Sequence, residues 1–134
     1  MTIREAVWRR IDDMADDLWK LSMQIHDHPE LGFEEHQAAG WLAEVLEAGS
    51  FSVERGIGNM ATAFRATHPA IAQGPRLAVL AEYDALPDLG HACGHNIIAC
   101  IAVGAALGLA PHKAELPGVL STGGAAFCVG QQDP

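Results

Sequence analysis

The sequence LAVLAEYDALPDLGHACGHN, residues 77–96, decides most of what can be predicted about the fold. Its first five residues form a short, continuous apolar run, which is typical of a central strand covered on both faces. The run leads directly into the acids Glu82 and Asp84, and a Gly-rich turn carrying Cys93 and His95 follows. Because ligands bind at the carboxyl ends of strands in open α/β sheets, we expect a functional site in this stretch.

Helices are predicted on both sides of this stretch. Apolar residues recur at helical spacing from Ile3 to Ile25, and Thr2 with Glu5 fits a capping box at the start of that helix. His28-Pro29 ends the run, since the residue before a proline avoids the helical region. Further helices are predicted over residues 34–48 and 96–110, the second apolar nearly all round and therefore buried.

Strands are predicted where apolar and polar residues alternate, over residues 51–54 and 61–66, in addition to the buried run at 77–81. Residues 67–75 contain two prolines and a glycine and are predicted to form a surface loop. The order of helices and strands is typical of an α/β layered fold, with helices packed on a mixed, mostly parallel sheet.

The last stretch of the chain follows no clear pattern. Pro117-Gly118 leads into a strand that begins at Val119-Leu120, but the residues from Ser121 onward show no continuing periodicity. A sheet that stops one strand after a buried helix is incomplete. We therefore expect two regions, 1–118 and a divergent C-terminal tail at 119–134, in an apparently truncated chain.

Charge and composition exclude several classes of function. The 134 residues carry a formal net charge of −9, which argues against binding nucleic acid or an anionic membrane. The start of the chain lacks the continuous apolar core of a secretory leader, and the apolar run at 97–111 is shorter than a membrane span. Three cysteines, an odd number, favour a reducing compartment, so we expect a cytoplasmic protein.

The tripeptide Cys93-Gly94-His95 has the composition of a metal site. A thiolate and an imidazole two residues apart in a turn can reach one ion, and zinc accepts both sulfur and nitrogen ligands. A working centre needs more donors, and the candidates nearby are four residues: Glu82, Asp84, Asp88 and His91. A Cys–His nucleophilic pair is the weaker alternative, because no orienting third residue is evident. Cys100, inside a helix, and Cys128, without a nearby partner, are expected to be small buried hydrophobes.

Four segments resemble, in order, the M20 metallopeptidase family, and most closely the N-terminal part of its amidohydrolase and dipeptidase-like branch. The segments lie at residues 25–35, 62–64, 81–87 and 90–96. The resemblance implies an α/β catalytic domain with a two-metal centre that hydrolyses amide bonds. The substrates would be small peptides or N-acyl amino acids, the metal zinc or manganese, and homodimers would be expected only in full-length relatives.

The resemblance also assigns roles to individual residues. It implies that Cys93 and His95 are metal ligands and that Asp84 orients a ligand, a supporting task close to the catalytic centre. Glu82 stands where other branches have a histidine ligand, so its role is open, and His91 is a less certain candidate for the metal. A bound metal would polarise the scissile carbonyl and lower the pKa of a bridging water.

The departures from the family pattern point to a second interpretation. The family continues into a strand that ends in a Glu-Glu pair, one of which is the general base, whereas no glutamate follows Glu115 here. The later histidine ligands are also missing, so we expect the 134 residues to be inactive alone. The alternative is a non-catalytic fragment, or a small metal- or partner-binding module. A thiol redox protein is a third interpretation, disfavoured because Cys100 lies seven residues from Cys93 inside an apolar helix.

Overall fold

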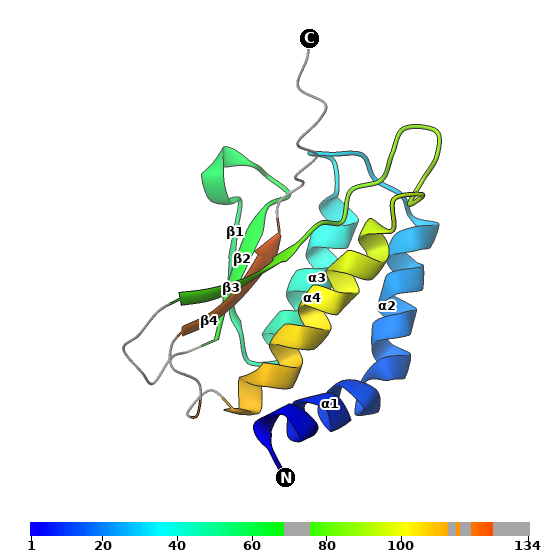
Figure 1. The fold of residues 1–134 in the computed structure, drawn as a ribbon. Helices are drawn as coiled ribbons and strands as arrows, with labels where there is room; N and C mark the ends of the chain where they lie inside the picture. Colours follow the sequence, from blue (N-terminus) through cyan, green and yellow to red (C-terminus); the bar gives the residue numbers. More distant parts are fainter. Residues whose placement is uncertain (69–75, 113–114, 116–118, 125–134) are drawn as a thin grey trace.

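The computed structural model describes residues 1–68, 76–112, 115 and 119–124, and shows helices packed against one side of a small sheet (Figure 1). Residues 69–75 of the loop predicted at 67–75, Pro117-Gly118 and Cys128 lie outside the described residues, whereas Thr67 ends a strand. The elements in chain order are α1 (Ile3–Asp13), α2 (Ala15–Asp27), α3 (His36–Ala48), β1 (Ser52–Arg55), η1 (Ile57–Asn59), β2 (Phe64–Thr67), β3 (Arg76–Ala81), α4 (His95–Leu109), η2 (Ala110–His112) and β4 (Val119–Gly124).

The sheet has the strand order β1-β2-β4-β3, so the last described strand in the sequence lies between two earlier ones. β1 pairs with β2 and β2 with β4 in antiparallel register, and only β3 and β4 are parallel among the strands of the described part. The prediction of an α/β fold with a mixed sheet is confirmed in this part of the protein. The prediction that the sheet is mostly parallel is wrong, because the β1–β2 hairpin joins it in the antiparallel sense.

Among the described strands, β3 stands at one end of the sheet order, with β1 at the other, which corrects the prediction of a central strand covered on both faces. Val79 and Ala81 pack into the core formed with the helices. They lie on the same face because side chains two residues apart in a strand point the same way. Leu80 points to the other face, where it is 77% exposed, while Leu77, on the same face as Val79, is 55% exposed near the start of the strand. The apolar run is therefore buried on one face only within the described part of the chain.

The predicted first helix is two helices that meet at Met14. The capping box at its start is confirmed, because the Thr2 hydroxyl accepts from the Glu5 backbone and the Glu5 carboxylate accepts from the Thr2 backbone. Met14 has φ −96° and ψ 1°, outside helical values, so the chain bends there. The bend lets both halves follow α4, since Ile11 packs near Gly108 and Leu18 near Gly104.

α4 is the central helix of the protein and is buried as predicted. α1 and α2 pack on one side of it, and β3 and β4 lie on another (Figure 1). The window His95–His112 has the length and hydropathy of a membrane span, but 56% of it is buried inside the fold, as expected for a core helix. This helix begins at the predicted site, so its packing fixes where His95 lies.

The boundary predicted after residue 118 does not coincide with a boundary of the sheet. Residues Val119–Gly124 form β4 and pair along their whole length with β3 and over four residues with β2. The first six residues of the predicted tail therefore belong to the fold. Divergence of residues 119–134 from the family pattern stays a prediction.

Candidate metal centre

The acids of the predicted site lie directly after β3, in a segment held by an earlier loop. The backbone N–H of Ala85 donates to the Glu30 carbonyl oxygen at 2.7 Å, and Leu31 bridges Ala85 in the parallel sense. The loop that follows α2 is therefore bound alongside the end of β3. This contact fixes the backbone on which Glu82 and Asp84 stand.

A tight turn brings His95 to the same place. Gly94 has φ +81°, a left-handed conformation that suits glycine, and its N–H donates to the His91 carbonyl at 3.0 Å. The prediction that this glycine allows a tight fold between Cys93 and His95 is confirmed. α4 begins at His95, so the imidazole stands at the first residue of a long, buried helix.

His95 lies between two carboxylates. Its Nδ1 is 2.9 Å from Oδ1 of Asp84 and 3.0 Å from the Asp84 carbonyl oxygen, and its Nε2 is 3.0 Å from Oε2 of Glu82. The side chain of Asp84 is 1% exposed, that of His95 13% and that of Glu82 38%. The row of three side chains therefore runs from the interior to the surface and opens to solvent at Glu82.

This row leaves room for a proton or a cation between His95 and Glu82. Both neighbours of Nδ1 are oxygen acceptors, so Nδ1 carries a proton. Nε2 then faces the Glu82 carboxylate either as a second N–H of an imidazolium or with a lone pair directed at a cation. Two ligands bound to one tetrahedral metal at about 2.0–2.2 Å stand roughly 3.4 Å apart, so Nε2 and Oε2, 3.0 Å apart, would separate by a few tenths of an ångström to hold one. A carboxylate on the far nitrogen of a metal-binding histidine is the usual supporting contact, and Asp84 occupies that position.

The structure does not bring the other predicted ligands to this pair. Among the described residues, no three His, Cys, Asp or Glu side chains gather closely enough to hold a metal ion. Cys93 is an exposed free thiol in the turn before α4. His91 is 8% exposed and neither ring nitrogen makes a well-formed hydrogen bond to a described residue; its burial, aided by neighbouring His26 and His95, lowers the pKa of the ring. Metal binding by Cys93 and by His91 stays a prediction.

The residues beneath Asp84 were not identified from the sequence as part of the site. Glu35, Thr62 and Tyr83 are all buried, and Tyr83 immediately precedes Asp84. Each belongs to a different segment, and all three lie within segments that resemble the M20 family, at residues 25–35, 62–64 and 81–87. No role in the site could be assigned to them from the sequence, because their contacts join segments that are far apart in the chain.

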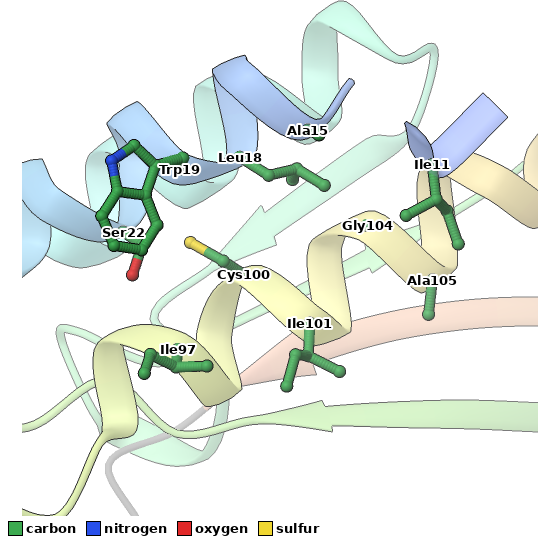
Figure 2. Close-up of a pocket in the computed structure, with 10 residues that line it drawn as sticks. All are labelled: Ile11, Ala15, Leu18, Trp19, Ser22, Ile97, Cys100, Ile101, Gly104 and Ala105. Atoms are coloured by element: carbon green, nitrogen blue, oxygen red, sulfur yellow. The ribbon is translucent and has the colours of Figure 1, made fainter. Parts of the chain in front are cut away.

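A separate apolar groove lies between the helices and away from the row. It has a volume of about 410 Å³ and is lined by residues of α1, α2 and α4 (Figure 2). Figure 2 shows the sulfur of Cys100 directed toward Trp19 and Ser22 across the groove. Neither Glu82 nor His95 lines it, so the groove is not the site of the predicted chemistry.

Comparisons with known proteins relate the chain to hydrolases. It is 51% identical over 109 residues to Xaa-Arg dipeptidase of Mus musculus, covering 75% of this chain and 25% of that protein. It is 39% identical over 121 residues to a component of the p-aminobenzoyl-glutamate hydrolase of Escherichia coli strain K12, covering 77% of this chain and 23% of that protein.

The fold has a similar counterpart among solved structures. A dinuclear metal-binding peptidase of the M20 family from Bacillus subtilis superposes with a TM-score of 0.75 and 26% identity, over 84% of this chain and 35% of that one. No protein-family model matches the chain. The chain thus spans about a quarter of the length of the curated relatives described above.

Proposed function

Because the chain is related to the M20 peptidases and amidohydrolases over about a quarter to a third of their length, we propose that it supplies part of a metal centre that hydrolyses amide bonds. The observation that carries the proposal is His95 held between Asp84 and Glu82. Nε2 of His95 and Oε2 of Glu82 would hold one divalent cation, zinc or manganese. Cys93, in the exposed turn next to His95, would become the third ligand when that turn moves toward the pair.

Each residue of the row has a distinct task. Asp84 accepts a hydrogen bond from the Nδ1–H of His95, which selects the tautomer that leaves Nε2 available and keeps the ring from turning. Glu82, at the solvent end, neutralises charge on the cation and is accessible to an arriving ion. When bound, the metal polarises a substrate carbonyl and lowers the pKa of a coordinated water.

We propose that the 134 residues alone bind such a cation weakly and do not catalyse turnover. Hydrolysis also needs a base positioned to take a proton from the attacking water. Between Glu115 and the end of the chain the sequence holds a single acid, Asp133, and no acidic pair. The substrate class, dipeptides or N-acyl amino acids, and a cytoplasmic location are proposals of the same kind.

Cobalt titration of the purified chain tests the metal site. Thiolate ligation of Co²⁺ gives a charge-transfer absorption band, which we expect to appear for the wild-type chain and to disappear in Cys93→Ser. His95→Gln should weaken Co²⁺ binding by about ten-fold or more. The matched controls are Cys100→Ala and His36→Gln, which should leave the band and the affinity unchanged. Absence of the band in the wild-type chain, or its persistence in Cys93→Ser, would contradict the assignment of Cys93.

The exposed apolar surface favours a second candidate function, binding of another polypeptide. Trp19 and Ile101 are each 65% exposed at the groove, and Leu80 is 77% exposed on the open face of the sheet. An exposed apolar surface of this kind promotes association. Under this candidate the chain self-associates, and sedimentation equilibrium should show mass increasing with concentration. A monomer at all concentrations would exclude it.

A further inference from the structure

Glu35 is a buried carboxyl group that packing alone does not explain. Its side chain is 0% exposed, although it lies at the start of α3, where acids are normally solvated. Oε2 accepts a hydrogen bond from the Thr62 hydroxyl at 2.7 Å, while Oε1 makes no well-formed hydrogen bond within the described part of the chain. A buried polar atom without a partner lowers the stability of the fold, so its retention requires another reason.

A continuous set of contacts joins Glu35 to the proposed metal centre. The Thr62 carbonyl oxygen accepts a hydrogen bond from the Tyr83 hydroxyl at 2.6 Å, and Tyr83 is 0% exposed. Tyr83 is followed directly by Asp84, which holds Nδ1 of His95. Glu35 therefore fixes Thr62, Thr62 fixes the Tyr83 ring, and the ring sets the backbone from which the Asp84 side chain projects.

The two acids have different surroundings. Burial raises the pKa of Glu35, against the hydrogen bond from Thr62 and nearby backbone groups that lower it. Asp84 faces the His95 ring, whereas the Glu35 carboxyl group faces the Thr62 hydroxyl.

We propose that Glu35 is a positioning residue of the metal centre, which holds the Asp84 carboxylate against Nδ1 of His95 through Thr62 and Tyr83. The proposal deepens the proposed function and rests on it for its biological purpose. It makes a claim about the chain without added metal as well, because every contact from Glu35 to His95 is made by this protein's own side chains and backbone. Glu35 touches neither substrate nor metal in this account.

Two substitutions at Glu35 separate positioning from packing. Glu35→Leu fills the same buried space with an apolar side chain, so it should keep the fold, whereas it cannot accept the Thr62 hydrogen bond. Glu35→Gln keeps an oxygen acceptor without an ionisable group. Thr62→Val should act like Glu35→Leu, and Thr62→Ser should act like the wild type.

The readout is the protonation pattern of the His95 ring in two-bond ¹H–¹⁵N correlation spectra of the metal-free chain, assigned by its loss in His95→Gln. We expect the Nδ1-protonated form in the wild type, Glu35→Gln and Thr62→Ser, and a mixture of tautomers in Glu35→Leu and Thr62→Val. Arg10→Ala is the control for general destabilisation, since it removes a distant contact and should leave the His95 pattern intact. An unchanged pattern in a folded Glu35→Leu chain would overturn the proposal.

Cobalt affinity then tests whether positioning matters for metal binding. We expect Glu35→Leu to bind Co²⁺ about ten-fold more weakly than the wild type and Glu35→Gln to bind within about two-fold of it. Equal affinity of Glu35→Leu and wild type would also overturn the proposal. Failure of the wild-type chain to bind Co²⁺ would instead refute the proposed function, while the spectra would still decide the role of Glu35.

Discussion

Oε2 of Glu82 lies 3.0 Å from Nε2 of His95, on the opposite side of the ring from Asp84. If a cation occupies this gap, removing the charge of Glu82 removes one ligand and half of the charge compensation. We therefore expect Glu82→Gln to weaken Zn²⁺ binding by about ten-fold or more in calorimetric titration. Glu54→Gln is the matched control, because Glu54 is an exposed carboxylate that pairs with Arg65 on the sheet. Equal Zn²⁺ affinity of the two variants would refute the role of Glu82.

Glu35 gives the stability of the protein a specific pH dependence. Because burial raises the folded-state pKa of Glu35 above its unfolded value of 4.5, its contribution to stability is full below pH 4.5 and is lost as the pH rises through the folded-state pKa. The Glu35→Gln variant has no ionisable group at this position, so its stability does not fall for this reason as the pH rises. The free energy of unfolding of the wild type minus that of Glu35→Gln should thus fall as the pH rises from about 4 to about 8, measured by urea denaturation. A difference that is constant with pH would contradict the raised pKa.

Gly108 is required by the packing of α1 on α4. A Cβ atom at this position would stand 3.1 Å from Val7 Cγ1 and 3.1 Å from Ile11 Cγ1, two β-branched side chains with little freedom to move. The overpacking should outweigh the higher helix propensity of alanine, so Gly108→Ala should lower the free energy of unfolding by about 1 kcal/mol.

Gly40 provides the control for Gly108, because it lies inside α3 and a Cβ there would meet nothing within 4 Å among the described residues. Gly40→Ala should raise the free energy of unfolding by about 0.5–1 kcal/mol through helix propensity alone. Chemical denaturation measures both variants. Stabilisation by both substitutions would show that Val7 and Ile11 move aside easily.

Arg10, in α1, caps the C-terminal end of α4. Its Nε donates a hydrogen bond at 2.9 Å to the Leu107 carbonyl, one of the last carbonyls of a helix that has no basic residue in its final turn. Arg10→Ala should lower the free energy of unfolding by about 1 kcal/mol, measured by denaturation. Arg9→Ala, at an exposed neighbouring position, should change it by less than about 0.5 kcal/mol. Similar losses in both variants would indicate a general effect of charge.

The cysteines should differ in reactivity. Burial raises the pKa of the Cys100 thiol to about 11, so little thiolate forms at neutral pH, whereas Cys93 is exposed. In a Cys128→Ser background, we expect a disulfide reagent at about pH 8 to label one thiol quickly and the second only in denaturant. Rapid labelling that survives in Cys93→Ser would contradict this assignment.

The helices could be predicted from the sequence because their signals are local. The apolar spacing through Ile11, Met14 and Leu18 continues across the bend at Met14, since one non-helical residue hardly disturbs the period, and the bend was therefore missed. The capping box of Thr2 needed only its own four residues and was predicted correctly.

Pairing between distant strands could not be predicted in the same way. Nothing in the composition of residues 77–81 distinguishes a central strand from an edge strand with one open face, because that depends on which other strands are present. The row at His95 was partly predictable, since Glu82 and Asp84 follow a strand and His95 lies in a turn. Glu35 was not, because its burial depends on Thr62 and Tyr83, which reach it from two other segments.

The place of β4 in the sheet has a consequence for synthesis on the ribosome. β2 and β3 both pair with β4, which is translated after them and lies between them. Before residues 119–124 emerge, the β1–β2 hairpin and the β3–α4 unit have no backbone ladder in common within the described part of the chain. Until β4 emerges, helix packing through α3 can join the two parts, and the sheet closes when those six residues leave the ribosome.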